Sequence, residues 1–474
     1  MAGCAVGPNF ERPAPPAAQS YTAAPPQSAP GTTNVAGGEA QRFVEALEIP
    51  AQWWELFHSE PLNELIQRSL TNNPDLKAAQ AALVVARENV LAQRGAYYPH
   101  IDGSFAASRQ RQSGFIAPTP NANVFQYNLF TPQLNVSYVP DVFGLNRRTV
   151  EASQAQEEGA RYQMIATYLT LSANVVVAAI QEASLRAQIE TTRQLIGICS
   201  NMVDIVQFQY TNGYAGGLDV AAQQSQLAQV TATLPPLLKQ LAQQDDLLAV
   251  LAGDFPGAQG GEAFDLSKLK LPEALPVSLP SRLVEQRPDI LQAEENLHAA
   301  SAQIGIAIAN RVPNITLAAN VGSTALSLDK LFTSGSGFWG IGGTLAQPIF
   351  EGGTLLHQEH AAEAAYVQAV QQYRATVLTA CQNVADTLNA LEQDAAALKT
   401  AAAAATAAKV TLDLCSEQWR VGYGGYLALL NAEQTCQLAQ LNLVQAQANR
   451  FADTAALFQA LGGGWWNQAE LNEK

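Results

Sequence analysis

Two stretches of the chain alternate apolar and polar residues with the period of two that is typical of β-strands. They begin just after Pro99 and Pro313, and each is followed by a return stretch that ends before Pro140 or Pro348. The apolar positions are Ile101, Gly103, Phe105 and Ala107, then Leu134, Val136 and Tyr138, then Ile315, Leu317, Ala319 and Val321, with residues 338–346 as the last stretch. The pattern predicts two strand hairpins, over residues 99–141 and 313–349.

The segments between the hairpins have the pattern of long helices. Residues 146–210 contain no proline and few glycines, which predicts a single helix about 100 Å long. Pro235 and Pro236 predict a break or kink in the helix that returns from it. No apolar run approaches the roughly 18 residues of a transmembrane helix, and residues 175–180 come nearest. Any passage through a membrane is therefore expected to use the strands.

Four strands cannot close a β-barrel, because about eight is the practical minimum. The strand pattern therefore predicts an oligomer in which several copies complete one barrel. A soluble coiled-coil rod is an alternative for the long helices, but a rod does not account for the two amphipathic hairpins that interrupt them.

The chain contains this order of elements twice. Pro74-Asp75 returns as Pro288-Asp289, 214 residues later, while Ala166-Thr167 and Gly213-Tyr214 return as Ala375-Thr376 and Gly422-Tyr423, each 209 residues later. We expect residues 1–60 to form an N-terminal extended segment and equatorial region, 61–253 a first repeat, 254–280 a linker, 281–462 a second repeat and 463–474 a C-terminal tail. Such a duplication is typical of a built structure rather than of an enzyme, and no nucleophile, base and orienting group recur together.

Composition and charge narrow the classes of partner and ligand that the protein can bind. The formal net charge is −15 and no run of Lys and Arg appears, which argues against nucleic acid as a partner. His357 and His360 have a spacing that can bind metal on one helix face. Without a third ligand we expect a solvated helix surface there, and we predict no metal site and no cofactor.

The cysteines are too scattered for a zinc motif, and four of the five fall in helical stretches, where a lone cysteine is usually a small buried hydrophobe. Cys4 is different, because Ala2-Gly3-Cys4 resembles the end of a bacterial lipoprotein signal. We expect Cys4 to carry a lipid anchor, with residues 13–40, rich in Pro, Ala, Ser and Gly, as an extended leash. The alternative is a free cysteine near a flexible terminus.

Several motifs along the chain resemble those of one family. They are Cys4-Ala-Val-Gly-Pro-Asn-Phe, Trp53-Trp54 with Pro61-Leu-Asn-Glu-Leu65, Asp141-Val-Phe-Gly144, Leu279-Pro-Ser-Arg-Leu283 with Arg287-Pro-Asp-Ile290, Pro348-Ile-Phe-Glu-Gly-Gly353, Arg420-Val-Gly422 and Ala460-Leu-Gly-Gly-Gly-Trp465. In this order they resemble the lipoprotein branch of the TolC-like outer-membrane efflux proteins over nearly the whole chain.

The resemblance implies an α+β membrane protein that works as a homotrimer. Four strands from each of three chains would close a twelve-stranded barrel in the outer membrane, and the helices would continue as a helical barrel across the periplasm. It also implies a passive duct for drugs or other small toxic compounds, joined by a periplasmic adaptor protein to an inner-membrane pump of the resistance-nodulation-division type. A duct for metal-ion efflux or type I protein secretion is the close alternative, and a non-conducting coiled-coil structural protein of the envelope is the distant one.

The helix-turn-helix tips, residues 210–219 and 419–428, are where such a tunnel would narrow. Both turns contain glycines, which allow tight turning and close approach of a partner's backbone. These glycines are Gly213, Gly216 and Gly217 in the first turn and Gly422, Gly424 and Gly425 in the second. We expect them to take part in docking of the adaptor.

The resemblance also assigns a gate to side chains around these turns, but the match is partial. Asp219 keeps the family's first-half aspartate, whereas the second-half positions that would carry Tyr, Arg and two Asp hold Trp419, Gly424, Ala428 and Asn431. We expect the gate to involve Tyr210, Asp219, Trp419 and Arg420. We hypothesise that Asp219 pairs with Arg420 across neighbouring helices, the alternative being a solvated arginine and an aspartate that caps its helix.

Overall fold

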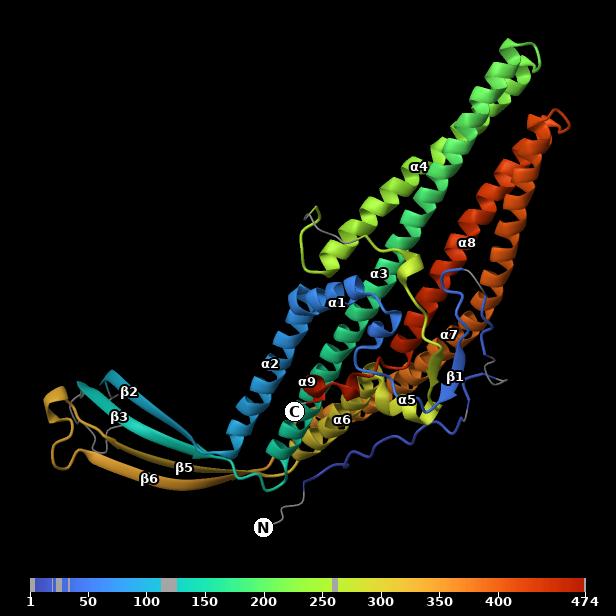
Figure 1. The fold of residues 1–474 in the computed structure, drawn as a ribbon. Coiled ribbons are helices and arrows are strands. Elements are labelled where there is room, and N and C mark those ends of the chain that lie inside the picture. Colours follow the sequence, from blue (N-terminus) through green and yellow to red (C-terminus); the bar gives the residue numbers. More distant parts are fainter. Residues whose placement is uncertain are drawn as a thin grey trace. The chain divides into compact units, whose positions relative to one another are not determined.

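Two long helices of equal length dominate the computed structural model, and each turns back into a shorter helix (Figure 1). α3, Leu145–Thr211, and α7, Thr354–Arg420, have 67 residues each, and the return helices α4, Gly217–Leu251, and α8, Tyr426–Ala460, have 35 each. The helix predicted over residues 146–210 is therefore confirmed, with one more residue at each end. The structure describes residues 5–18, 20–22, 28–32, 35–111, 126–257 and 263–472.

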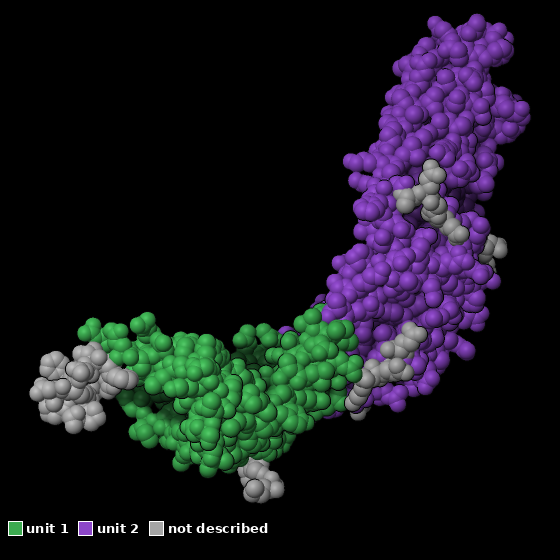
Figure 2. All heavy atoms as spheres, turned by 90° about the vertical axis from the view of Figure 1, so that its left-hand side faces the viewer, with its two compact units in different colours: residues 1–13, 82–160, 292–373 green, residues 14–81, 161–291, 374–474 purple. Residues whose placement is uncertain are grey.

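The chain divides into two compact units, which Figure 2 shows in green and purple. The first contains Met1–Pro13, Ala82–Ala160 and Gln292–Tyr373, and the second contains Ala14–Ala81, Arg161–Leu291 and Arg374–Lys474. Each unit therefore takes segments from both halves of the duplicated sequence.

The first unit contains one antiparallel sheet in the order β2-β3-β5-β6. Its strands are β2, His100–Arg111, β3, Gln126–Tyr138, β5, Asn314–Ser323, and β6, Gly337–Ala346. All four predicted strands are thus confirmed. Prolines stand just outside both hairpins, and Pro132 lies inside β3 opposite Phe105.

The register of the sheet separates an apolar face from a polar face. One row across the four strands joins Ile101, Val136, Ala319 and Ile341, and the next row joins Asp102, Asn135, Asn320 and Gly340. On the polar face the Asn135 side-chain amide donates to Asp102 at 2.9 Å. The apolar side chains remain open in the single chain, where Ile101 is 65% and Ile341 81% exposed.

Shorter helices precede each hairpin. They are α1, Glu60–Asn72, α2, Pro74–Arg94, α5, Pro280–Gln286, and α6, Pro288–Ala309. Pro74 and Pro288 begin their helices, where the missing N–H has no partner to lose. The remaining short elements are η1, Trp53–Phe57, η2, Gly95–Tyr97, η3, Leu266–Lys268, η4, Leu328–Lys330, η5, Trp465–Asn467, and α9, Ala469–Asn472.

The second unit also contains a parallel strand pair that the sequence pattern did not reveal. β1, Arg42–Glu45, pairs with β4, Ala274–Val277, which lies inside the segment predicted as a linker. The core of this unit includes Trp53, which stacks on Phe458 with ring centroids 5.4 Å apart. Trp53 is 1% exposed and Phe458 also 1%, so this aromatic pair lies in the interior.

The expected break in the first return helix is wrong, because α4 continues through Pro235 and Pro236, and a kink there stays a prediction. The carbonyl groups that lose their N–H partners belong to Thr231 and Ala232, which are exposed, so water can hydrate them. In addition, one described helix, α3, contains an 18-residue window apolar enough for a membrane span, although 61% of that window is buried inside the protein, as in a core helix.

Candidate functional site

The first tip turn joins α3 to α4 and depends on one glycine. Gly213 has φ +78°, in the left-handed region that favours glycine, and its N–H donates to the Tyr210 carbonyl at 3.0 Å. The N–H of Tyr214 donates to the Gln209 carbonyl at 2.8 Å. These two bonds satisfy the carbonyl groups at the end of α3 and reverse the chain.

The second tip turn repeats this geometry. Gly422 has φ +83°, its N–H donates to the Trp419 carbonyl at 3.0 Å, and the N–H of Tyr423 donates to the Gln418 carbonyl at 2.9 Å. At Gly424, a Cβ atom would lie 2.9 Å from the backbone nitrogen of Trp419, so the chain passes too close for a side chain. Tight turning at Gly213, Gly422 and Gly424 is therefore confirmed.

The other three tip glycines have ordinary backbone angles. Gly216 and Gly425 precede α4 and α8 with φ −89° and −75°. A Cβ atom at Gly425 would meet nothing within 4 Å, and one at Gly217 would lie 3.7 Å from the Tyr210 ring. The turn itself does not require glycine at these positions, and their part in adaptor docking stays a prediction.

Asp219 and Arg420 each have a partner on their own hairpin. The Asp219 carboxylate accepts the Gly216 N–H at 2.9 Å, which caps the start of α4. Arg420 donates to Glu417, three residues earlier, at 2.7 Å, and both side chains are exposed. Glu417 is not among the residues predicted for the gate. The pairing of Asp219 with Arg420 across neighbouring helices stays a prediction.

Trp419 lies inside an apolar cluster that joins the two hairpins below the tips. The side chain is 9% exposed, and its ring centroid lies 6.3 Å from that of Tyr426. The buried members of the cluster are Met202, Val206, Val220, Ala408, Leu412, Trp419, Leu429, Ala432 and Cys436. Tyr210, by contrast, is 49% exposed. Of these two predicted gate residues, Trp419 therefore packs between the hairpins and Tyr210 lies on the surface.

A buried polar network crosses the same cluster. The Tyr426 hydroxyl donates to the Gln223 side-chain oxygen at 2.6 Å, and the Gln223 amide donates to Glu433 Oε2 at 3.3 Å. The Cys199 thiol approaches the same carboxylate oxygen at 3.9 Å. Glu433 is 2% exposed, and its Oε1 has no hydrogen-bond partner among the described residues.

Burial sets the electrostatics of this network. It raises the pKa of the Glu433 carboxyl, because a charge without a counter-ion is poorly solvated inside the protein. Burial and the neighbouring Glu433 raise the pKa of Cys199 to about 12. The pKa of the Tyr426 hydroxyl is raised for the same reason, burial first and then Glu433. A thiol or a hydroxyl that keeps its proton serves packing rather than nucleophilic chemistry.

Both tips expose an aromatic and an aliphatic side chain at matching positions. Tyr214 is 83% and Leu218 82% exposed, and 209 residues later Tyr423 is 91% and Leu427 70% exposed. Large apolar side chains repeated at equivalent places on a surface favour contact with another protein.

The segment that follows Cys4 is fixed to α3, whereas Cys4 itself lies outside the described residues. The guanidinium of Arg148, a residue 3% exposed, donates to the Val6 carbonyl at 3.1 Å, the Gly7 carbonyl at 3.2 Å and the Asn9 side chain at 2.9 Å. The residues that follow Cys4, the predicted lipid anchor, are therefore held in place by a buried guanidinium group.

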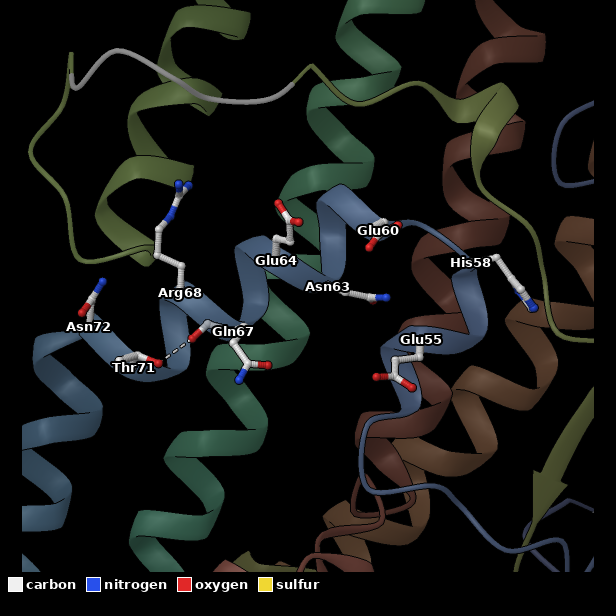
Figure 3. A pocket seen from close by; sticks show the side chains of 9 residues that line it. All are labelled: Glu55, His58, Glu60, Asn63, Glu64, Gln67, Arg68, Thr71 and Asn72. Carbon is white, nitrogen blue, oxygen red and sulfur yellow. Dashed lines mark hydrogen bonds between the residues drawn. The ribbon is translucent and has the colours of Figure 1, made fainter.

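A groove of about 970 Å³ lies along η1 and α1 in the second unit (Figure 3). Its lining consists of Glu55, His58, Glu60, Asn63, Glu64, Gln67, Arg68, Thr71 and Asn72. None of the residues predicted for the gate or the anchor lines it. In the part of the chain that the structure describes, no group of three or more His, Cys, Asp or Glu side chains can hold a metal ion.

Comparison with known proteins identifies the fold. At 28% identity over 473 residues, the antibiotic efflux pump outer membrane protein ArpC of Pseudomonas putida matches 99% of this chain, which covers 94% of ArpC. The toluene efflux pump outer membrane protein TtgC of P. putida gives the same identity and coverage. The solved structure of the outer-membrane channel OprN superposes with a TM-score of 0.88 at 24% identity, covering 98% of this chain and all of that one.

The family model for outer membrane efflux proteins matches residues 65–254 and 279–463, one segment in each half of the duplication. These segments contain the four strands of the antiparallel sheet, the long helices and both tips. The chain therefore belongs to the outer membrane efflux protein family and is an outer-membrane component of an efflux system.

Proposed function

We propose that three copies of this chain form one channel, in which their sheets close a single barrel through the outer membrane and their hairpins continue as a tunnel in the periplasm. The four-stranded sheet, with one apolar face, one polar face and β2 and β6 as its outer strands, carries this proposal. Four strands are too few to enclose a lumen, and lipid offers no hydrogen bonds to an open strand edge. Threefold closure pairs β6 of each copy with β2 of the next.

The two faces then have separate roles. Ile341 and its row would face lipid, and Asn135 with Asp102 would face the water-filled lumen. Ile341→Arg should therefore reduce the amount of protein inserted in the outer membrane, because a cation on the lipid face costs about 2–4 kcal/mol at mid-depth. Thr344→Arg, on the opposite face of the same strand, should insert normally and alter ion selectivity. Equal insertion of both variants would contradict the assignment of the faces.

The channel is passive and works with two partners. A periplasmic adaptor docks on the tips, where Tyr214, Leu218, Tyr423 and Leu427 offer apolar surface next to the six tip glycines. An inner-membrane pump of the resistance-nodulation-division type supplies the energy. The proposed cargo is drugs and other small toxic organic compounds, in keeping with the antibiotic and toluene efflux named for the relatives. Cys4 carries the lipid anchor, close to the segment that Arg148 holds.

The gate hypothesis makes a separate prediction. If Arg420 of one hairpin pairs with Asp219 of another across the closed tip, Arg420→Ala should raise the single-channel conductance in lipid bilayers. Glu417→Gln is the matched control, because it removes the observed partner of Arg420 and leaves the arginine free for Asp219. Unchanged conductance in Arg420→Ala would remove the latch from the proposal.

Two measurements test the whole proposal. The purified protein should be trimeric and should conduct ions in planar bilayers. A strain that lacks the gene should become hypersensitive to several unrelated antibiotics, dyes and detergents, and the restored gene should reverse this. Sensitivity to metal salts alone would favour the metal-export alternative. A monomer without conductance would favour a structural protein of the envelope.

A further inference from the structure

Two exposed apolar segments lie beside the outer strands of the four-stranded sheet. Tyr97 and Tyr98 precede β2 by three and two residues, and Tyr98 is 74% exposed. Ile349 and Phe350 follow β6 by three and four residues and are 89% and 88% exposed. Side chains of this kind in water indicate a surface that another molecule covers.

The duplication shows what such a turn looks like when it is covered. In the first half, the turn after β3 contains Val142 and Phe143, and the segment behind Cys4 packs on it. The Val6 N–H donates to the Phe143 carbonyl at 3.0 Å, and Ala5 lies so close to Gly144 that a Cβ there would be 2.7 Å from the Ala5 Cα. Two residues after the matching prolines, Val142 in the covered turn is 44% exposed, whereas Phe350 in the second half is 88% exposed.

The sheet topology places the two open segments at the same end of the sheet. All three strand pairs are antiparallel, so β2 starts and β6 ends on the same side. The row that begins at His100 crosses Ser137 and Ala318 and reaches β6 at Gly342. β6 then continues to Ala346, four residues further (346 − 342).

This stagger predicts which residues of the adjacent copy lie beside β6. In a closed barrel each strand is displaced along its neighbour in the same sense. The β2 of the adjacent copy must therefore start beyond Gly342, towards the C-terminal end of β6. The first residues of that β2 then lie beside the last residues of β6. Because the two strands are antiparallel, Tyr98 of the adjacent copy lies beside residues 348–350.

We propose that Ile349 and Phe350 of each copy pack on Tyr97 and Tyr98 of the adjacent copy and close the barrel seam at its periplasmic end. This contact, the seam clamp, rests on the proposed trimeric barrel and names the partner surface within it. The occupant is a second copy because the unpaired edges of β2 and β6 lie directly beside the two segments and have to meet each other in a membrane. The clamp supplies in trans the apolar cover that Ala5 and Val6 give the first turn in cis.

Cysteine cross-linking of the full-length protein in membranes tests the clamp. In a background with Cys381→Ala and Cys415→Ala, which removes the two half-buried free cysteines, we expect Tyr98→Cys combined with Phe350→Cys to give covalent dimers and trimers with a short bis-maleimide. Neither single variant should form them. Tyr98→Cys combined with Ile341→Cys is the matched control, because Ile341 is equally open on β6 but lies nine residues up the chain from Phe350 (350 − 341).

The outcomes separate the clamp from the channel proposal. A trimer that conducts but does not cross-link at 98 and 350, or that cross-links equally at 98 and 341, overturns the clamp and leaves the channel intact. A monomer that neither conducts nor cross-links overturns both. Reaction of Phe350→Cys in the intact trimer with a maleimide confined to the lipid phase overturns the clamp in favour of a lipid contact.

A second comparison uses two phenylalanines of equal exposure. Phe350→Ser should increase dissociation of the trimer on dilution in detergent by about tenfold or more, the effect expected from losing one buried aromatic side chain at the interface. Phe255, 89% exposed and in the unit that does not contain the sheet, is the control, and Phe255→Ser should leave the trimer unchanged. Equal dissociation of the two variants would overturn the clamp.

Discussion

Replacing Glu433 with glutamine tests whether a buried carboxyl governs the packing of the two hairpins. Glu433 is 2% exposed, and its Oε2 receives only the Gln223 amide at 3.3 Å and the Cys199 thiol at 3.9 Å among the described residues. α7 contributes apolar side chains such as Leu412 to the same cluster. Glutamine has nearly the same shape and no charge, so Glu433→Gln keeps the packing and removes the titration.

The raised pKa determines the direction of the effect. When the hairpins separate, Glu433 meets water and its pKa returns towards 4.5. Above that pH the separated state is ionised while the packed state keeps its proton, so the packed state binds more protons and loses stability as the pH rises. The slope is about 1.4 kcal/mol per pH unit and per copy, until the packed carboxyl also ionises. Below pH 4.5 the loss is absent.

Hydrogen exchange of the backbone amides of α8 around Glu433 measures this free energy of separation. The rates are taken from pH 5 to pH 8 on the intact assembly and corrected for the pH dependence of chemical exchange. We expect the free energy of opening to fall with pH in the wild type and to stay level in Glu433→Gln, which is then the better protected at pH 8. Glu190→Gln, an exposed position on α3 bonded only to Gln194 at 3.1 Å among the described residues, should follow the wild type.

Two results would refute this reasoning. Parallel profiles for the wild type and Glu433→Gln would mean that the carboxyl has the same protonation in the packed and separated states. Weaker protection of the variant at every pH would mean that the charged carboxylate stabilises the hairpins, through a partner that the single chain does not supply.

Three further predictions follow from other groups. Burial raises the pKa of Cys199 to about 12, so maleimide should label Cys199 far more slowly than the half-buried Cys415 at pH 8, and mass spectrometry would detect equal labelling if this is wrong. Gly422→Ala should destabilise the second tip by about 1–2 kcal/mol, because φ is +83°, whereas Gly425→Ala, with φ −75° and open space, should not; faster exchange of the turn amides in the first variant alone is the expected readout. Burial, followed by a hydrogen bond and repulsion from Asp453, raises the pKa of Asp394 to about 7. The wild type should therefore lose stability as the pH rises from 4 to 7, and Asp394→Asn should not. Thermal unfolding of both proteins at those pH values measures the difference.

The strands and long helices could be predicted because their signals are local. Alternation after Pro99 and Pro313, and the absence of proline from residues 146–210, depend on neighbouring residues alone. The pair of β1 and β4 has no such signal. Each strand has four residues, and Phe43 pairs with Leu275 from the other half of the sequence, so only the packing of the second unit brings them together.

The candidate site was predictable in part for the same reason. Left-handed turns need glycine, so Gly213 and Gly422 could be assigned from their place between two helices. Glu433 was missed, although Leu429, Ala432 and Cys436 form an apolar stripe at helical spacing that contains it. An acidic residue in such a stripe indicates a buried partner, but no sequence rule identifies Gln223, 210 residues away, as that partner.

The two tips have the same backbone and different chemistry. Asp219 closes the start of α4 by accepting the Gly216 N–H, and 209 residues later the equivalent position is Ala428, which leaves α8 without that bond. The second tip instead has the exposed pair of Arg420 and Glu417, and such pairs contribute about 0–1 kcal/mol. The start of α8 is therefore stabilised mainly by the buried network, in which the Tyr426 hydroxyl donates to Gln223 and the Gln223 amide donates to Glu433. Loss of the Tyr426 hydroxyl therefore removes support from the start of α8, whereas α4 keeps its Asp219 bond, although duplication made the helices equal in length.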